Sequence, residues 1–391
     1  MDTADVVVVG LGAVGSATLH RLALQGVRAV GIDRFDPPHA HGSTHGGSRV
    51  TRLAVAEGDA YVPLVRRSHE IWRELEQETG ETLLREIGLL MIGEGDGAPS
   101  HGRPGFLGAT IDVARRHSIA HEILGSAEIR RRYPQFAVRD ADRGFFEPTA
   151  GVVFPEAGVA VQLRLARMHG ATIRPNEAVL SVAPHGDGVL VTTDHGSIAA
   201  GRVVLTAGAW LPGLAGGIMA DMVQVHRQTL LWFEPDEPRL YDPAACPVFI
   251  WMHGATEADY LYGFPLLPGE PGVKVGSERY DGHTEPDRVD RTIPEEEVRT
   301  LYDRHVEGRL LGLSRRLSKS ATCLYAVTPD AGFIIDRLRE DGTVLAASCC
   351  SGHGFKHSPA LGEAVAAAAM APARAMAPEF SLARFGAAVP A

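Results

Sequence analysis

The sequence predicts an α/β protein with two domains, and three observations support this. A hydrophobic run at 5–9 leads into a glycine-rich turn and then into a segment with helical periodicity. Hydrophobic runs typical of buried strands recur at 202–210 and 343–348. The chain has 391 residues, 45% of them hydrophobic, which is more than one simple core accommodates.

Charge and composition limit the possible partners and compartment. The formal net charge of -10 provides no general basic field, so we expect neither a nucleic-acid nor a membrane partner. The N-terminal apolar run is short and lacks a basic flank, which indicates a strand and not a signal peptide, and no apolar segment approaches the roughly 20 residues of a membrane span. The 4 cysteines lack CxxC spacing, which favours a reducing, cytoplasmic compartment.

The N-terminal segment predicts a strand at 5–9, a helix at 16–25 and a second strand at 28–32. Between the first two, GxGxxG is completed by Gly10, Gly12 and Gly15. These glycines allow a tight turn, close approach of the backbone to a pyrophosphate, and close packing of helix on strand. Asp33 ends the second strand, where it can accept hydrogen bonds from a ribose hydroxyl. The motif favours a dinucleotide site but does not choose between NAD and FAD.

An extended loop is predicted after Asp33, in RFDPPHAHGSTHGGSRVTRLAVAEGDAYVPL. An NAD-type domain would continue into a helix, whereas prolines, glycines and small polar residues favour a loop that wraps something. Arg49 and Arg52 are three residues apart and would share one side of a short helix beginning there. Surface salt bridges are the alternative for both arginines.

These residues resemble the monomeric sarcosine oxidase and N-methyltryptophan oxidase family, which are FAD-dependent amine oxidases of the D-amino-acid oxidase superfamily. The resemblance extends nearly from end to end. The matching motifs, in chain order, are GLGAVGSA, DPPHAHGSTHGGSRVTR with EGDAYVPL, LTAGAWL at 205–211, YGFP at 262–265, VKVG at 273–276, CLY at 323–325, GFIID at 332–336 and SGHGFK at 351–356.

The resemblance implies a Rossmann-like FAD-binding domain interrupted by an α+β substrate domain with a mainly antiparallel sheet. An amphipathic pattern at 61–76 predicts a helix, and TLLWFE and YLYGFP predict strands. We expect the FAD-binding domain to comprise 1–80, 145–217 and 321–391, and the substrate domain to comprise 81–144 and 218–320.

The resemblance also implies which residues hold the cofactor. Cys323 matches the cysteine bonded through sulfur to the flavin 8α-methyl carbon, and a nearby basic side chain would favour the required thiolate. An ordinary buried cysteine is the alternative. The other expected FAD contacts are Gly10, Gly12, Ala13, Val14, Gly15, Asp33, Arg34, Ser43, Arg49, Val179, Ala207, Gly208, Gly352, Gly354, Phe355 and Lys356.

Lys356 resembles the lysine that grips a substrate carboxylate together with the arginine at Arg52. Two cations on one carboxylate select amino acids over simple amines. Tyr325 shares a strand face with Cys323, and Tyr262 matches a pocket tyrosine of the family. The family's loop histidine is retained as His45.

Lys274 matches the lysine near flavin N5 that promotes the reaction of reduced flavin with oxygen. A fixed ammonium there would stabilise the negative charge that forms on oxygen, and Arg49 would add a second positive charge. The implied reaction transfers a hydride from the carbon next to a neutral amine to flavin N5, giving an imine and hydrogen peroxide.

Glu278 departs from the family pattern, because sarcosine and N-methyltryptophan oxidases carry histidine at this position of KxGxH. A carboxylate could favour a cationic or more polar substrate, or it could pair with Lys274 and lower its effective charge. The departure argues against sarcosine itself as the substrate. The loop also differs at Thr44, Gly47 and Ser48, where the family has histidine, aspartate and threonine.

The stretch CCSGHGFKHSP at 349–359 contains residue types that bind metals, but no ligand set is completed by spacing, so we expect no metal. Gly352 and Gly354 instead let the backbone pass close to a flavin, with N–H groups toward the ring O2. Ser358 and Pro359 predict the N-cap and first residue of a helix.

The leading hypothesis is a monomeric FAD-dependent oxidase of a secondary or N-methylated amino acid, with that amine and O2 as its partners. An oxidase of a cyclic imino acid or primary amine in specialised biosynthesis is the alternative within this chemistry. An NAD-dependent dehydrogenase and a flavin-binding protein without turnover are the alternatives outside it.

Overall fold

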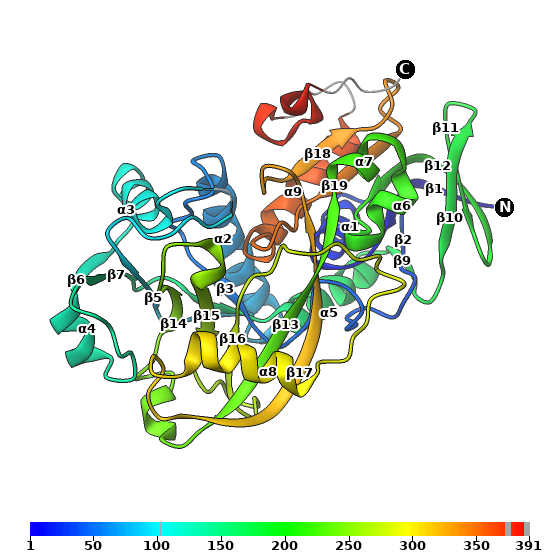
Figure 1. Cartoon of the computed structure of the whole chain (residues 1–391). Coiled ribbons are helices and arrows are strands. Elements are labelled where there is room, and N and C mark those ends of the chain that lie inside the picture. The colour runs from blue at the N-terminus through cyan, green and yellow to red at the C-terminus, as the bar shows by residue number, and fades with distance from the viewer. Residues whose placement is uncertain (102, 372–376, 387–391) are drawn as a thin grey trace.

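The computed structural model describes residues 1–101, 103–371 and 377–386, and within these ranges it contains two large sheets and a small one (Figure 1). The first large sheet and its helices lie toward the two chain termini, and the second lies on the opposite side of the molecule. The protein is therefore of the mixed α/β class predicted from the sequence.

The first sheet contains the predicted N-terminal βαβ unit. β1 pairs in parallel with both β2 and β12, β2 with β9, and β12 with β19, while β10, β11 and β18 add antiparallel edges. The bounds are β1 (Asp2–Val9), β2 (Ala29–Ile32), β9 (Thr172–Arg174), β10 (Val179–His185), β11 (Gly188–Thr193), β12 (Gly196–Leu205), β18 (Ile334–Arg337) and β19 (Val344–Ser348).

The second sheet is mainly antiparallel, as expected, with β14 and β5 as its parallel pair. In order across the sheet, its strands are β17 (Leu313–Val327), β13 (Gln224–Pro235), β16 (Val273–Gly276), β15 (Tyr260–Phe264), β14 (Val248–Met252), β5 (Leu89–Glu94), β7 (Asp142–Glu147) and β6 (Glu122–Gly125). β7 and β17 cross the predicted domain boundaries at 144 and 320. The division into an FAD-binding domain and a substrate domain therefore stays a prediction.

The small sheet corrects one expectation. It consists of β3 (Arg49–Thr51), β8 (Gly151–Val153) and β4 (Leu84–Glu86), so a strand begins at Arg49 where a short helix was predicted. Because side chains alternate along extended backbone, Arg49 and Arg52 do not share a side. They reach different parts of the molecule, as described below.

α1 and α9 pack on the first sheet, whereas α3, α4 and α8 lie beside the second sheet (Figure 1). The α-helices are α1 (Ala13–Leu24), α2 (Tyr61–Thr79), α3 (Phe106–Arg116), α4 (Ser126–Arg132), α5 (Pro155–Met168), α6 (Leu211–Ala215), α7 (Gly217–Met222), α8 (Glu295–Leu301) and α9 (Ser358–Met370). Shorter helical turns are η1 (Gly208–Trp210), η2 (Pro238–Tyr241), η3 (Glu257–Asp259), η4 (Tyr302–Val306), η5 (Phe355–His357), η6 (Pro378–Phe380) and η7 (Leu382–Phe385).

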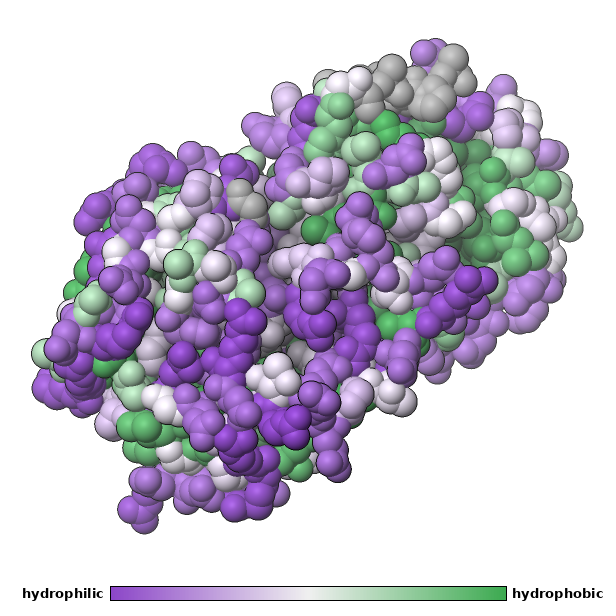
Figure 2. All heavy atoms as spheres, viewed as in Figure 1, coloured by the Kyte–Doolittle hydropathy of each residue, from purple (hydrophilic) through white to green (hydrophobic). Residues whose placement is uncertain are grey.

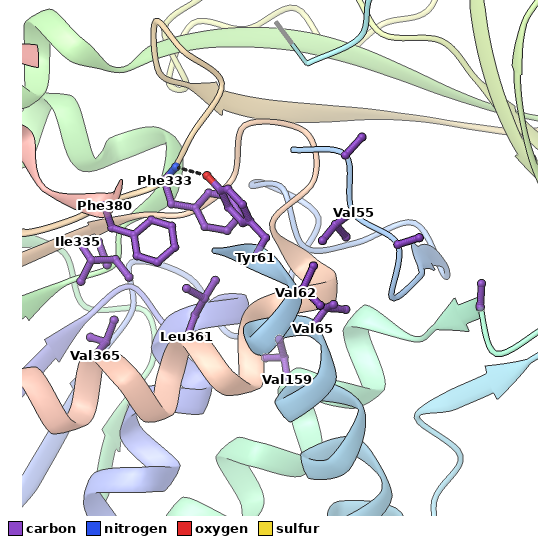
Figure 3. Packing of buried hydrophobic residues seen from close by; sticks show 14 of the residues in the cluster. Val55, Tyr61, Val62, Val65, Val159, Phe333, Ile335, Leu361, Val365 and Phe380 are labelled. Carbon is purple, nitrogen blue, oxygen red and sulfur yellow. Dashed lines mark hydrogen bonds between the residues drawn. The ribbon is translucent and has the colours of Figure 1, made fainter. Parts of the chain in front are cut away.

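The predicted amphipathic helix α2 packs its apolar face against α9. Figure 3 shows Tyr61, Val62 and Val65 of α2 in the same cluster as Leu361 and Val365 of α9. The Tyr61 hydroxyl also accepts a hydrogen bond of 3.2 Å from a backbone N–H in the loop after β17, at Phe333. This packing holds α9 against α2, the helix that follows the loop after Asp33.

The start of α9 differs by one residue from its prediction. Ser358 is the first helical residue, His357 occupies the cap position, and the Ser358 hydroxyl makes no cap hydrogen bond. Because the turn η5 runs directly into α9, the chain is already helical where an extended N-cap residue was expected.

The surface seen in Figure 2 is mostly hydrophilic, with hydrophobic residues gathered over α6, α7 and β10. Leu180 on β10 is 63% exposed. In the part of the chain that the structure describes, no helix is both long and apolar enough to cross a bilayer.

Close packing of α1 on α9 yields a first prediction. A Cβ at Gly362 would lie 2.3 Å from the Ala17 Cβ and 2.7 Å from its backbone carbon. Gly362→Ala is expected to lower the free energy of unfolding by about 1–3 kcal/mol, because the helices must separate. Urea unfolding measures this. Gly125→Ala is the control, since a Cβ there meets nothing within 4 Å; equal midpoints for the two variants would contradict the packing.

Candidate functional site

A cavity of about 580 Å³ lies between the two large sheets. Its walls include Val9 and Ile32 at the ends of β1 and β2, and Ile250 and Phe264 from the second sheet. The carboxyl ends of parallel strands are where α/β proteins bind dinucleotides. The cavity therefore connects the predicted dinucleotide site with the predicted substrate side.

The glycines at one end of the cavity have two different roles. Gly10 and Gly15 are required by the protein's own packing, because a Cβ on Gly10 would lie 2.6 Å from the Ala207 Cα and a Cβ on Gly15 would lie 1.8 Å from the Gly10 carbonyl oxygen. Gly12 and Gly208 line the cavity, and a Cβ on either would meet no protein atom closer than 3.5 Å. Their missing side chains leave room for a ligand to approach the backbone.

Asp33 lines the same end of the cavity and is buried. One of its carboxylate oxygens accepts a 2.7 Å hydrogen bond from the Leu11 N–H, and the other accepts a 2.9 Å bond from the Phe35 N–H. These bonds fix the carboxylate at the end of β2, and each oxygen keeps a lone pair for a ribose hydroxyl.

Most of the predicted cofactor contacts line the cavity. Gly15 and Cys323 do not: Gly15 packs behind the glycine turn, and Cys323 lies behind the loop at 43–49. Arg34 lines the cavity but is bound to Asp287 at 2.7 Å on the surface. Those that do line it are Gly10, Gly12, Ala13, Val14, Asp33, Arg34, Ser43, Arg49, Val179, Ala207, Gly208, Gly352, Gly354, Phe355 and Lys356.

The Cys323 thiol on β17 is fully buried beside a cation. Its Sγ lies 3.6 Å from Arg49 Nη2 and 3.6 Å from the Ser43 carbonyl oxygen. Burial raises the pKa of the Cys323 thiol, and the Arg49 guanidinium acts in the opposite direction. A basic group thus stands where the thiolate would need one.

Lys274 on β16 holds the same loop from the other side. Its Nζ donates hydrogen bonds of 2.8 Å and 2.9 Å to the carbonyl oxygens of Gly46 and Ser48, and burial lowers its pKa well below the ordinary value. His45, in this loop, is also buried, and burial lowers its pKa to about 4, so it is neutral. Neither side chain lines the cavity.

A cluster of buried charges lies at the substrate side of the cavity, around the carboxylate of Glu57. Arg52 Nη2 lies 3.1 Å and 3.0 Å from its two oxygens, and Lys356 Nζ lies 3.1 Å from Oε1. The Nδ1 atoms of His101 and His353 each lie 3.6 Å from the same Oε1. Arg52 and Lys356 therefore converge, as predicted, but on a carboxylate of the protein.

The protonation of this Glu57 cluster follows from its contacts. Burial alone would raise the pKa of Glu57, but Arg52 and Lys356 hold it well below its ordinary value. Burial lowers the pKa of Lys356 to about 8 although Glu57 opposes this. Burial also lowers the pKa of His353 well below its ordinary value. Glu57 is thus ionised, Lys356 is mostly charged at neutral pH, and His353 is neutral.

Glu278 does not pair with Lys274, which corrects one of the two alternatives for this residue. Its Oε1 lies 2.9 Å from His101 Nε2, and its Oε2 accepts a 3.0 Å hydrogen bond from the Tyr280 hydroxyl. Burial alone would lower the pKa of His101, yet Glu278 and Glu57 raise it to about 9. At neutral pH the pair is an imidazolium bound to a carboxylate.

Tyrosines surround this pair. The predicted residues Tyr262 and Tyr325 line the cavity together with Tyr260. Burial raises the pKa of each of the three above its ordinary value, so their hydroxyls stay protonated. They form a neutral wall that can donate or accept hydrogen bonds.

Sequence reasoning missed Glu57, His101, His353 and Tyr280, and also Glu147. Glu147 accepts hydrogen bonds from the backbone N–H groups of Leu53 and Ala54, 2.6 Å and 3.1 Å long, and so fixes the chain just after Arg52. Glu57 was open to discovery, because it is the first residue of the motif EGDAYVPL. His353 lies in the motif SGHGFK, and Tyr280 is only two residues from its partner Glu278. His101 and Glu147 carry no local signal, since their partners lie in distant parts of the chain.

Comparison with known proteins defines the family. A family model described as "FAD dependent oxidoreductase" matches residues 5–368. The chain belongs to this family. Membership decides for FAD over NAD, and the open glycines beside Asp33 fit a dinucleotide cofactor. In the described ranges, no group of three or more His, Cys, Asp and Glu side chains is arranged to hold a metal ion.

Individual relatives cover nearly the whole chain. It is 36% identical to a monomeric sarcosine oxidase of Streptomyces avermitilis, over 93% of both proteins. It is 33% identical to an N-methyl-L-tryptophan oxidase of Yersinia pestis, over 97% of this chain and 99% of the relative. The open form of NikD, an amino acid oxidase, has a TM-score of 0.83 at 25% identity, with 96% of each chain covered, which supports the fold.

The Glu57 cluster yields a second prediction. Glu57→Gln is expected to destabilise the protein by about 3–5 kcal/mol at neutral pH, because Arg52 and Lys356 remain buried without their counter-charge. Chemical unfolding monitored by circular dichroism measures this. Glu128→Gln is the control, because this carboxylate also binds two arginines but lies on the surface. Equal stability of the native protein and Glu57→Gln would contradict the assigned charges.

Proposed function

We propose that the protein is an FAD-dependent oxidase of a secondary or N-methylated amino acid that releases hydrogen peroxide. The observation that carries the proposal is the convergence of Arg52 and Lys356 on Glu57 in the wall of the cavity that the dinucleotide glycines also line. Its relatives include a monomeric sarcosine oxidase and an N-methyl-L-tryptophan oxidase, which are oxidases of N-methyl amino acids.

FAD, when bound, accepts a hydride from the carbon next to the substrate amine and passes the electrons to O2. The resulting imine leaves the site and is hydrolysed by water. The chain's part is positioning: the guanidinium of Arg52 and the ammonium of Lys356 bind the substrate carboxylate and hold the adjacent carbon in the cavity.

The site is suited to an amine in its neutral form, which hydride transfer requires. An ammonium would need a carboxylate whose charge is not yet compensated, but the charge of Glu278 is already compensated by the imidazolium of His101. The neutral hydroxyls of Tyr262 and Tyr325 can orient an uncharged amine. Loss of the ammonium proton before or during binding is therefore part of the proposal.

For the reaction with oxygen, Arg49 provides positive charge near the loop at 46–48, and Lys274 adds to it when it is protonated. Arg49 is always protonated, whereas burial disfavours the charged form of Lys274. We assign the fixed charge to Arg49 and the adjustable one to Lys274. Both would stabilise negative charge developing on oxygen.

The proposal has four further parts, of which the first rests on the same site. We infer that Cys323 forms the covalent bond to the flavin, supported by the guanidinium of Arg49 3.6 Å from its sulfur. We also infer the discontinuous division into an FAD domain and a substrate domain. The free state of the four cysteines supports a reducing, cytoplasmic location, and we expect a monomer.

An oxidase of a cyclic imino acid or primary amine is the second candidate. Glu278 favours it, because the family's N-methyl amino acid oxidases have histidine at that position. The structural neighbour NikD, described as an unusual amino acid oxidase essential for nikkomycin biosynthesis, shares the fold over 96% of both chains.

The direct test measures amine-dependent peroxide formation by the flavin-loaded protein with N-methyl, cyclic and primary amino acids, each beside its carboxyl-free analogue. An N-methylated or other secondary amino acid is expected to be oxidised, and its analogue to react at least about a hundredfold more slowly because two charged contacts are lost. If no compound reduces the flavin under anaerobic conditions, the proposal fails. Preference for a cyclic or primary amino acid would favour the second candidate.

Covalent attachment is tested separately. Acid precipitation of the native protein is expected to leave the flavin spectrum with the polypeptide, whereas Cys323→Ala is expected to release the flavin into the supernatant. Cys349→Ala is the matched control, because it removes another free cysteine, one that lines the cavity. Release of flavin from the native protein would contradict the assignment of Cys323.

A further inference from the structure

We propose that His101 is a third cationic group of the substrate-carboxylate site, and that Glu278 is a positioning residue that keeps His101 charged. The inference deepens the proposed function and rests on it, because it assumes a substrate with a carboxylate. His101 lies outside every motif that pointed to the site.

His101 has a hydrogen-bond donor, Nδ1, for which the described part of the chain offers no acceptor within hydrogen-bond distance. Its side chain is buried and lines the cavity from the loop between β5 and α3. Nε2 is bound to Glu278 at 2.9 Å. Nδ1 is buried, and its nearest carboxylate, that of Glu57, lies 3.6 Å away, too far for a hydrogen bond; within the described residues it has no partner. A substrate carboxylate oxygen would provide the missing acceptor.

His353 occupies a similar position but differs in its chemistry. Its Nε2 lies 2.9 Å from the carbonyl oxygen of Ala331, so Nε2 carries the proton and, in the neutral ring, Nδ1 is an acceptor. Burial keeps this ring neutral. His353 therefore cannot donate to a carboxylate from Nδ1, whereas the imidazolium of His101 can.

The charges that contact one another in the Glu57 cluster match a single carboxylate. Among the described residues of this cluster, Arg52, Lys356 and His101 are positive and Glu57 and Glu278 are negative, which leaves one positive charge in excess. A buried excess charge is costly unless it is paired. A substrate with one carboxylate and a neutral amine balances it. A cationic side chain or a second carboxylate does not.

The groups that face His101 define the pH range of the effect. They are Glu278 and Glu57, the neutral ring of His353 and the perpendicular ring of Phe106. Arg52 and Lys356 act on His101 through Glu57, and Tyr280 acts through Glu278. His101 is charged below its pKa of about 9 and loses its charge as the pH rises through that value. Lys356, with a pKa of about 8, titrates in the same range and must be separated experimentally.

The test measures acetate binding to the flavin-loaded protein by calorimetry between about pH 6 and 10, beside the difference spectrum of the flavin. His101→Asn is chosen because φ at this residue is 49°, a conformation that asparagine tolerates. The variant is expected to bind acetate about tenfold or more weakly at neutral pH, because a charged hydrogen bond is lost. Its remaining pH dependence reports Lys356 alone.

Glu278→Gln keeps the shape of the site and tests the positioning role. Without the Glu278 carboxylate, the pKa of His101 falls, so acetate affinity is expected to rise as the pH is lowered below about 7, where native affinity is level. His117→Gln is the control, because this histidine also pairs with a carboxylate, Asp59 at 2.9 Å, but on the surface; its acetate binding should equal that of the native protein.

Two results would overturn the inference: His101→Asn binding acetate within about twofold of the native protein, or Glu278→Gln keeping the native pH profile. Because acetate binding requires no turnover, it is independent of the proposed oxidase reaction. If acetate binding follows the expectation but no amine reduces the flavin, the carboxylate site stands and the oxidase proposal fails. If amines are oxidised but His101→Asn binds acetate as tightly as the native protein, the inference fails and the oxidase proposal stands.

Discussion

The buried carboxylate of Glu57 is the interaction on which the rest of the site depends. It receives Arg52 from 5 residues away in the chain and Lys356 from 299 residues away. Without it, two cations would be buried with no counter-charge, a state that proteins rarely tolerate. With it, both cations are held in place before any substrate arrives. A substrate carboxylate therefore binds to a preorganised site, and binding costs little conformational entropy of the side chains.

The fold delivers these charges from separate elements. Arg52 follows β3, Glu57 precedes α2, and Lys356 lies in η5 between the first sheet and α9. The second sheet contributes Glu278 after β16 and His101 after β5. Glu147, at the end of β7, fixes the backbone beyond Arg52. The site therefore exists only where the two sheets meet, and each sheet alone presents an incomplete set of charges.

Local patterns predicted the parts of the fold that depend on nearby residues. The N-terminal βαβ unit and the amphipathic helix α2 were found because periodicity and glycine spacing determine them locally, whereas the mainly antiparallel second sheet was implied by the family resemblance. The helix expected at Arg49 was wrong, because β3 is fixed by pairing with β8 about a hundred residues later. Partners such as His101 for Glu278, 177 residues apart, are set by tertiary packing, which no local pattern records.

The central claim is that a substrate carboxylate completes the charge balance of the Glu57 cluster. It is tested most directly by a crystal structure of the flavin-loaded protein with a bound N-methyl amino acid analogue that cannot be oxidised. The account predicts that the carboxylate of the analogue lies within hydrogen-bond distance of Arg52, Lys356 and His101 Nδ1, with its amine toward the tyrosines. A carboxylate bound elsewhere in the cavity, with Arg52 and Lys356 contacting only Glu57, would contradict it.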